Sequence, residues 1–352
     1  MLNNPSFNMV DIHTLFMQRA LDLSLLGRGK VEPNPMVGCV IVKENRIIGE
    51  GYHVFFGGPH AEVNAVKGLS ESDLEGADVY VTLEPCSHYG KTPPCANMLA
   101  GLPVKRIIIG SVDYNPLVEG KGIALLKEAG KEVITGVLQE ECEKVNAAFF
   151  TFLKKKRPYI ILKWAQTGDG FIARKNNDSK WISNELSRKL VHKWRSEVQA
   201  ILVGSNTVFH DNPQLTTRDW SGKNPLRLII DRKARLENNF AIFDQSVPTI
   251  IYNEVKKTSG ENPEYVKLQA GEFIESLLAD LYDRSILNLF IEGGSTLINE
   301  FIKHNLWDEA RVFIGAKSFE EGIKAPEIIM TPEKYYTIGN DKLLIYKNKE
   351  NG

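Results

Sequence analysis

The stretch GGPHAEVNAV at residues 57–66, followed by LEPCSHYGKTPPC at residues 83–95, combines a closely spaced His and Glu with two Cys. One imidazole (His60) and two thiolates (Cys86, Cys95) form a donor set that zinc takes in tetrahedral sites, and three ligands leave one position free for water. The carboxylate of Glu62 could take a proton from that water and deliver it to a leaving amine. We interpret these residues as a catalytic zinc site. A structural zinc site is the main alternative, although it more often uses four ligands and has no need of Glu62.

Strand-like and helical patterns alternate on both sides of these segments. Strands are predicted at 37–42, 46–52, 77–83, 104–110 and 132–136, with a tight turn at Glu44-Asn45 between the first two. Helices are predicted at 14–26, from the His60 segment to about residue 69, from about residue 95, at 123–130 and at 139–153. This alternation predicts an α/β layer fold with a largely parallel sheet.

The basic run KKKRP at residues 154–158 is the best candidate for a domain boundary, although it is also what a solvated helix C-terminus looks like. We predict a first domain at 1–157 and a second at 158–352. In the second, strands are predicted at 158–166, 198–205, 225–231, 248–253, 286–294 and 309–316, and helices at 184–195, 271–283 and 295–305. This is a second α/β domain.

The bulk composition excludes several classes of protein. The chain of 352 residues has a net charge of -1, 43% hydrophobic and 25% charged residues, and four Cys. These values are typical of a globular enzyme and argue against a disulfide framework or a basic nucleic-acid groove. No apolar run approaches membrane-spanning length, and no signal peptide is recognisable at the N-terminus. We expect a cytoplasmic protein without a nucleic-acid or membrane partner. The oligomeric state stays open, and a homo-oligomer is compatible with the sequence.

The first domain resembles the zinc deaminases, in which a hydroxide attacks a base and ammonia leaves. Their usual P-C-x-x-C spacing is lengthened here to eight intervening residues. With PNPMVGCVIV (33–42), GEGYH (49–53) and TLEPCSHYGKTPPC (82–95), the chain resembles the deaminase half of the bifunctional riboflavin biosynthesis deaminase/reductases. The resemblance implies a cytidine-deaminase-like three-layer domain. It also implies substrate contacts from Asn34, His53 and Lys91, the last suited to a phosphate.

The second domain contains no G-x-G-x-x-G fingerprint, and its most glycine-rich element is FIEGGSTLINEF (290–301). Together with KWAQTGDGFIA (163–173), DSKWIS (178–183) and VGSNTVFHDNPQLTTR (203–218), it resembles the reductase half of the same enzymes, with a dihydrofolate-reductase-like fold. The resemblance implies NADPH bound along Lys163, Ala165, Trp181, Thr207, Asp211, Arg232, Gly294, Ser295 and Thr296. It implies substrate held by Ser179, Arg195, Leu215, Arg218 and Glu292. Lys163 and Asp211 would lie nearest the hydride transfer.

The sequence thus predicts a bifunctional enzyme of riboflavin synthesis that acts on small phosphorylated pyrimidines. Its first domain, with zinc, would deaminate 2,5-diamino-6-ribosylamino-4(3H)-pyrimidinone 5′-phosphate. Its second would reduce the ribosyl chain of 5-amino-6-(5-phosphoribosylamino)uracil to ribityl with NADPH. Two alternatives remain: a nucleic-acid base deaminase with an appended nucleotide-binding domain, and a binding or regulatory protein that keeps the fold without the chemistry. Neutral net charge argues against the former, and Glu62 against the latter.

Overall fold

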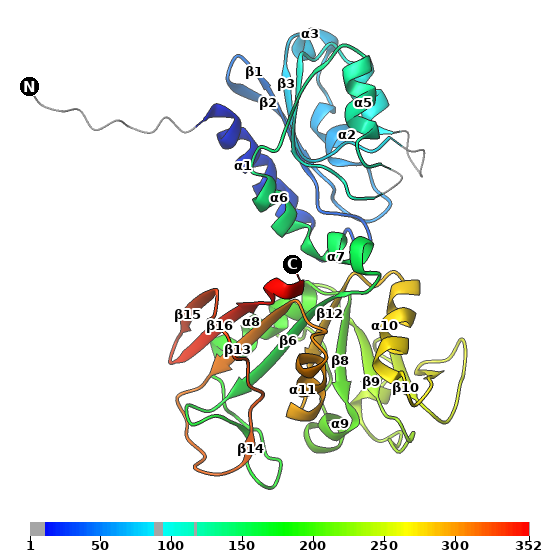
Figure 1. Ribbon diagram of the computed structural model, residues 1–352, viewed down its shortest axis with the longest axis vertical. Coiled ribbons are helices and arrows are strands. Elements are labelled where there is room, and N and C mark those ends of the chain that lie inside the picture. The colour runs from blue at the N-terminus through cyan, green and yellow to red at the C-terminus, as the bar shows by residue number, and fades with distance from the viewer. Residues whose placement is uncertain (1–10, 88–93, 116–117, 352) are drawn as a thin grey trace, which may run out of the picture. The chain divides into compact units, whose positions relative to one another are not determined.

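The computed structural model describes residues 11–87, 94–115 and 118–351. The chain divides into two compact units, Met1–Lys155 and Lys156–Gly352. Each unit is built on its own main sheet with helices packed against it, as Figure 1 shows. The α/β class predicted from the alternation of strands and helices is confirmed. No helix within these described ranges is long and apolar enough to cross a membrane.

The first unit contains a five-stranded sheet in the order β2-β1-β3-β4-β5. Its strands are β1 (Gly38–Lys43), β2 (Arg46–Tyr52), β3 (Asp78–Leu83), β4 (Arg106–Ser111) and β5 (Glu132–Thr135). Its helices are α1 (Ile12–Ser24), α2 (Ala61–Val66), α3 (Glu71–Leu74), α4 (Cys95–Gly101), α5 (Lys121–Glu128), α6 (Gln139–Val145) and α7 (Ala147–Lys155), with a 3-10 turn at Leu25–Gly27.

The prediction of a largely parallel sheet is wrong for this unit. β1 runs antiparallel to both β2 and β3, and only the β3-β4 and β4-β5 pairs are parallel. The reversal between β1 and β2 takes place at the predicted turn, where Glu44 and Asn45 have φ angles of 52° and 60°. Two consecutive positive φ values are typical of the two-residue turn that matches the twist of a β-hairpin.

Helices cover both faces of this sheet, which explains why its inner strands β1, β3 and β4 are almost continuously apolar. On β1, Cys39 and Ile41 pack with α2 and α4 residues such as Ala61 and Leu99, whereas Val40 and Val42 pack with α1. Successive side chains of a strand point to opposite faces, so a strand buried on both has no polar alternation. The result is a three-layer unit, as the resemblance implied.

The second unit contains a nine-stranded sheet in the order β11-β10-β9-β8-β12-β6-β13-β16-β15 and a two-stranded sheet of β14 and β7. The strands are β6 (Tyr159–Gln166), β7 (Phe171–Ala173), β8 (Ala200–Gly204), β9 (Leu226–Ile230), β10 (Thr249–Asn253), β11 (Glu264–Lys267), β12 (Asn288–Glu292), β13 (Glu309–Ile314), β14 (Ile323–Lys324), β15 (Lys334–Ile338) and β16 (Asp341–Lys347). The helices are α8 (Glu185–Ser196), α9 (Ser205–Asp211), α10 (Phe273–Asp283) and α11 (Ser295–Lys303), with 3-10 turns at Ala241–Phe243 and Lys349–Asn351.

The large sheet is parallel from β11 to β13, and only β16 and β15 at one end are antiparallel. α10 and α11 pack on one face, where Leu277 and Phe301 join the core around Ile160 and Leu162 of β6. α8 packs on the other face, where Trp194 meets Phe290 edge to face and lies tilted against Phe313, at centroid distances of 6.2 and 5.5 Å. The carboxyl ends of β6, β8 and β12 therefore meet at one edge, where open α/β sheets bind ligands.

Arg157, in the basic run predicted as a boundary, is fixed within the second unit. Its Nη1 and Nη2 donate to the Asp308 carboxylate at 2.6 and 2.9 Å, and only 7% of Arg157 is exposed. The same carboxylate accepts the backbone N–H of Ile160 at 2.8 Å. The start of β6 is thus anchored by a buried ion pair.

Candidate active sites of the two units

His60, Cys86 and Cys95 come together in the first unit, as the motif spacing predicted. His60 is the N-cap residue of α2, Cys86 follows β3, and Cys95 begins α4. Their ligand atoms lie within 4.8 Å of one another, and His60 Nδ1 lies 3.6 Å from Cys86 Sγ and 3.4 Å from Cys95 Sγ. Two sulfurs and one imidazole nitrogen around a common centre fit a zinc ion with one position left for a water.

The surroundings of Cys86 favour its thiolate form. A hydrogen bond from the Cys95 thiol, opposed by burial, lowers the pKa of Cys86. The backbone N–H of Cys95, in the first turn of α4, also donates to Cys86 Sγ at 3.3 Å. Thiolates are the forms that bind metals, so these contacts favour Cys86 as a metal ligand.

Glu62 lies beside this cluster without being one of its three members. Its residue is 3% exposed, and burial raises the pKa of its carboxyl group. A raised pKa makes a carboxyl group hold a proton more readily, which suits a group that accepts a proton and returns it. The arrangement therefore supplies an acid–base group next to three potential metal ligands.

Asn34 and His53 form the adjoining wall of this site. His53 Nδ1 faces the Pro59 carbonyl oxygen at 3.0 Å, and its Nε2 lies 3.1 Å from Asn34 Nδ2. Burial lowers the pKa of His53, which favours the neutral ring. Nδ1 then donates to the carbonyl, and Nε2 accepts from the Asn34 amide. Lys91, the predicted phosphate contact, lies outside the described residues.

Asn146 is a supporting residue that the sequence analysis missed. Its side-chain oxygen accepts the Met36 backbone N–H at 2.8 Å, and its amide nitrogen donates to the Met36 carbonyl at 2.9 Å. It thereby holds the segment that carries Asn34. Its distance of 110 positions from Met36 leaves no local signal in the sequence. In the structure, the helix predicted at 139–153 is interrupted at Asn146, between α6 and α7.

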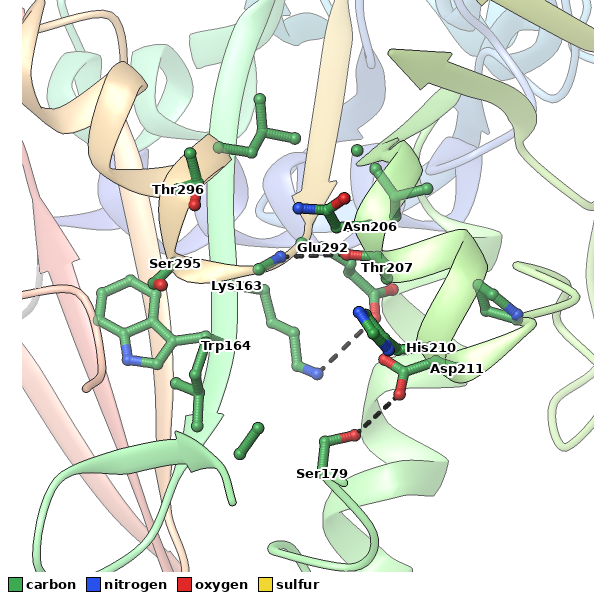
Figure 2. Close-up of a pocket in the computed structure, with 18 of the residues that line it drawn as sticks. Lys163, Trp164, Ser179, Asn206, Thr207, His210, Asp211, Glu292, Ser295 and Thr296 are labelled. Atoms are coloured by element: carbon green, nitrogen blue, oxygen red, sulfur yellow. Dashed lines mark hydrogen bonds and ion pairs between the residues drawn. The ribbon is translucent and has the colours of Figure 1, made fainter. Parts of the chain in front are cut away.

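The second unit contains a cavity of about 960 Å³ at the carboxyl ends of β6, β8 and β12. Every residue predicted for cofactor or substrate in this domain lines it: Lys163, Ala165, Ser179, Trp181, Arg195, Thr207, Asp211, Leu215, Arg218, Arg232, Glu292, Gly294, Ser295 and Thr296. Figure 2 shows Lys163 between Ser295 on one side and Thr207 and Asp211 on the other, with Ser179 joined to Asp211 by a hydrogen bond.

A buried charge cluster forms one side of the cavity. Arg195 donates from Nε and Nη2 to the Glu292 carboxylate at 2.7 and 3.0 Å, and Lys163 Nζ lies 3.7 Å from the same carboxylate. Burial opposes ionisation of Glu292, but the Arg195 and Lys163 charges hold its pKa down to about 2. Burial also lowers the pKa of Lys163. Arg195 Nη1 donates to the Thr216 carbonyl, so fewer of its N–H groups remain for a phosphate than the sequence suggested.

Asp211 faces this cluster from the end of α9. Its carboxylate accepts a hydrogen bond from the Ser179 hydroxyl at 3.1 Å, and burial raises the pKa of Asp211. Close by, the Thr207 hydroxyl accepts the backbone N–H of Gly294 at 3.2 Å and joins α9 to the turn before α11. Gly294 is the N-cap of α11 and has no side-chain cap, so the first amides of this helix remain suited to an anionic ligand.

His192 is a second residue that the sequence analysis missed, and it lines the same cavity. Its Nδ1 lies 2.9 Å from the Thr216 carbonyl, and its Nε2 lies 3.1 Å from Asp219. It holds the segment that carries Arg218. The available signal is its position three residues before Arg195 on α8, which places both side chains on one helix face.

Comparison with known proteins gives two family matches. Residues 10–111 match the cytidine and deoxycytidylate deaminase zinc-binding region, and residues 158–322 match the RibD C-terminal domain.

Curated relatives extend over nearly the whole chain. The riboflavin biosynthesis protein RibD of Aquifex aeolicus is 38% identical over 96% of this chain and 99% of its own length. RibD of Escherichia coli is 37% identical over 86% of this chain and 87% of its own.

Two solved structures are similar to nearly the whole chain. A diaminohydroxyphosphoribosylaminopyrimidine deaminase/5-amino-6-(5-phosphoribosylamino)uracil reductase from Thermotoga maritima is 40% identical, with a TM-score of 0.87 over 96% of this chain and 98% of its own. Acinetobacter baumannii RibD is 32% identical, with a TM-score of 0.86 over the same two shares.

Proposed function

Because this chain belongs to the RibD family of riboflavin biosynthesis proteins, it is a bifunctional deaminase and reductase, and we propose which of its residues carry out each reaction. The deaminase reaction hydrolyses the exocyclic amine of 2,5-diamino-6-ribosylamino-4(3H)-pyrimidinone 5′-phosphate. The reductase reaction converts the ribosyl chain of the resulting uracil to ribityl. The alternative of a nucleic-acid base deaminase is not supported, since the second unit matches a RibD reductase domain.

For deamination, His60, Cys86 and Cys95 would hold the zinc ion. Zinc bound there would act as a Lewis acid that makes a coordinated water nucleophilic at neutral pH. Glu62 would accept a proton from the water and donate it to the amine as ammonia leaves. The observation that carries this assignment is the buried Glu62 carboxyl group beside a three-ligand cluster.

Asn34 and His53 would orient the pyrimidine or its ribose. Because His53 Nδ1 is bonded to the Pro59 carbonyl and its ring is neutral, His53 would bind substrate as a polar, uncharged group. We keep Lys91 as the proposed phosphate contact, because its loop joins two of the zinc ligands.

For reduction, NADPH would lie along Ala165, Trp181, Thr207 and the turn from Gly294 to Thr296, with Arg232 at its 2′-phosphate. Bound NADPH would supply the hydride. Lys163 and Asp211 would be the polar groups nearest the reacting carbon, where they could hold or move the proton that accompanies hydride. Support comes from the lowered pKa of the partly buried Lys163, the raised pKa of Asp211 and their shared cavity.

The substrate of the reductase would be held by Ser179, Leu215, Arg218 and the Arg195–Glu292 pair. We assign the phosphate mainly to Arg218, since Arg195 already donates three hydrogen bonds within the protein. Arg195 would then contribute positive charge near the phosphate and form a rigid part of the cavity wall. A guanidinium group is suited to bidentate phosphate binding.

The test is to incubate the purified full-length protein with the diamino substrate, with and without NADPH, and to analyse products by mass. Without NADPH, we expect a mass change of about one unit as the amine is replaced by oxygen. With NADPH, we expect about two further units from the added hydrogens. Metal analysis should find zinc in the active protein, and NADH in place of NADPH should support reduction poorly. A protein that reduces but never deaminates would contradict the zinc-site assignment.

A further inference from the structure

Glu84 is a buried carboxylate that neither reaction described above uses. It follows β3 directly, stands two positions before Cys86, and is 3% exposed. Its own backbone N–H donates to the Ser111 carbonyl at the end of β4 at 2.9 Å. Burying a carboxylate costs free energy unless hydrogen bonds replace its contacts with water, so Glu84 needs partners within the protein.

Four backbone N–H groups donate to this carboxylate. Oε2 accepts from Asp113 at 3.3 Å and from Gly120 at 3.1 Å, and Oε1 accepts from Gly122 at 3.0 Å and from Ile123 at 3.2 Å. Gly120 is the N-cap of α5 and has no side chain to cap the helix. Glu84, which is distant from α5 in sequence, therefore caps the N-terminus of this helix. The helix dipole favours negative charge at that end.

The same contact fixes the backbone next to Cys86. A Cβ atom at Gly122 would lie 2.2 Å from the Pro85 carbonyl oxygen, so the start of α5 touches the Glu84–Pro85 segment directly. On the other side, the Cys86 carbonyl accepts the backbone N–H of Ala96 in α4 at 3.1 Å. Cys86 is thus held between the starts of two helices.

We propose that Glu84 is a positioning residue for Cys86, which sets the place of its sulfur relative to His60 and Cys95. The inference rests on the proposed zinc site. A carboxylate is required because all four partners are N–H donors, and it offers acceptors alone. A glutamine would turn an NH₂ group toward two of these donors, and the Pro85–Cys86 backbone would have to move away from α5.

The test compares zinc affinity in the full chain for the wild type and Glu84→Gln, by competition with a chromophoric chelator. We expect Glu84→Gln to bind zinc about 10–100-fold more weakly, the usual cost of losing a group that orients a metal ligand. The Co²⁺-substituted protein should also show a changed ligand-field spectrum, because the sulfur is displaced. Reductase activity, from the other unit, should stay unchanged.

The matched control is Asp78→Asn, at the first residue of β3, the strand that Glu84 follows. Asp78 pairs with Arg106 through both carboxylate oxygens, and it is not one of the three clustered ligands. Its loss should lower the stability of the first unit while leaving zinc affinity and the Co²⁺ spectrum as in the wild type. An equal loss of stability in Glu84→Gln with neither zinc readout altered would overturn the proposal.

Two further variants cover the case in which Glu84→Gln does not fold. Glu84→Asp keeps the charge but shortens the side chain, and it should recover part of the zinc affinity. In Gly122→Ala, the added methyl group should displace Pro85 while the Glu84 side chain is unchanged. This variant should weaken zinc binding and change the Co²⁺ spectrum. Wild-type zinc binding in both variants would contradict the proposal. Failure of the wild-type chain itself to bind zinc would instead contradict the proposed zinc site.

Discussion

The carboxyl group of Glu62 lies against the His60, Cys86 and Cys95 cluster but is not one of its three ligands. We predict that Glu62→Gln retains about one zinc per chain and loses deaminase kcat by about 10²–10⁴-fold, the usual contribution of a general acid–base group. Zinc analysis and single-substrate kinetics on the diamino compound measure both effects.

Reductase activity on the uracil intermediate is the internal control for Glu62→Gln and should match the wild type. Loss of zinc in proportion to loss of activity would show that Glu62 is a ligand, and its proposed role would then be wrong.

Arg232 lines the reductase cavity, with its side chain half-exposed. Its Nη1 lies 3.3 Å from Glu254, and its guanidinium lies 4.5 Å from the centre of the Phe273 ring, so it is held in place before any ligand binds. A charge-assisted hydrogen bond to the 2′-phosphate contributes about 1.5–3 kcal/mol, or roughly 10–100-fold in affinity. We predict that Arg232→Ala weakens NADPH binding by this factor and leaves NADH binding nearly unchanged, as two titrations would show.

Lys233→Ala is the comparison for this prediction, since Lys233 has the same charge and lies next in the chain. We expect it to weaken NADPH binding less. Equal losses for NADPH and NADH in Arg232→Ala would mean that Arg232 supports the fold or a part common to both cofactors.

At the scale of elements, the position of the start of β6 depends on the ion pair between Arg157 and Asp308. Arg157 and Asp308 are both buried, and removing one partner of a buried pair typically costs about 3–5 kcal/mol. We predict that Arg157→Met lowers the free energy of unfolding of the second unit by this amount, and its Tm by roughly 6–20 °C. Tryptophan fluorescence measures the free energy of unfolding in urea and the Tm on heating. It reports on the second unit, because all five tryptophans lie after residue 158.

The control is Lys189→Met on α8, which removes an exposed pair with Glu185. It should change stability by less than about 1 kcal/mol. A similar small effect of Arg157→Met would show that Asp308 is satisfied by its backbone partner alone.

Most long elements could be predicted because their periodicity is local. β2 was predicted with both of its observed ends, and β6, α8 and α10 within two residues. The strands β7 and β11 were missed because three or four residues contain too little pattern, and α9, β15 and β16 were missed as well. The break between α6 and α7 depends on a distant partner, Met36, which no local pattern contains.

The same distinction between local and distant contacts explains which features of the candidate sites could be predicted. His60, Glu62, Cys86 and Cys95 were predicted from residue chemistry, since each stands at the start of a helix or the end of a strand and is positioned by nearby backbone. In the second unit, the resemblance named residues that do share one cavity. It could not predict that Arg195 and Glu292, 97 positions apart, pair with each other, because such contacts are set by the packing of α8 against β12.

At the scale of the whole molecule, each unit has its own sheet and its own buried core. We predict that residues 156–352 form a folded reductase when expressed alone, and that residues 1–155 form a zinc-binding deaminase. Far-ultraviolet circular dichroism and the two activity assays test this. A fragment that starts at Pro158 should be less stable than one that starts at Lys156, because it lacks Arg157. If neither fragment is soluble while the full chain is, the two units depend on each other for folding.

The central place of β6 also matters while the chain is being made. β6 is the first strand of its unit to leave the ribosome, yet its neighbours β12 and β13 end at residues 292 and 314. At a synthesis rate of about 5–20 residues per second, the apolar segment YIILKW waits roughly 7–30 s for its second partner. Until β12 and then β13 have been made, at least one edge of β6 is unpaired and prone to aggregation, while the sequence of the first unit is already complete. Nascent chains should therefore depend most on chaperones while residues 167–314 are being translated.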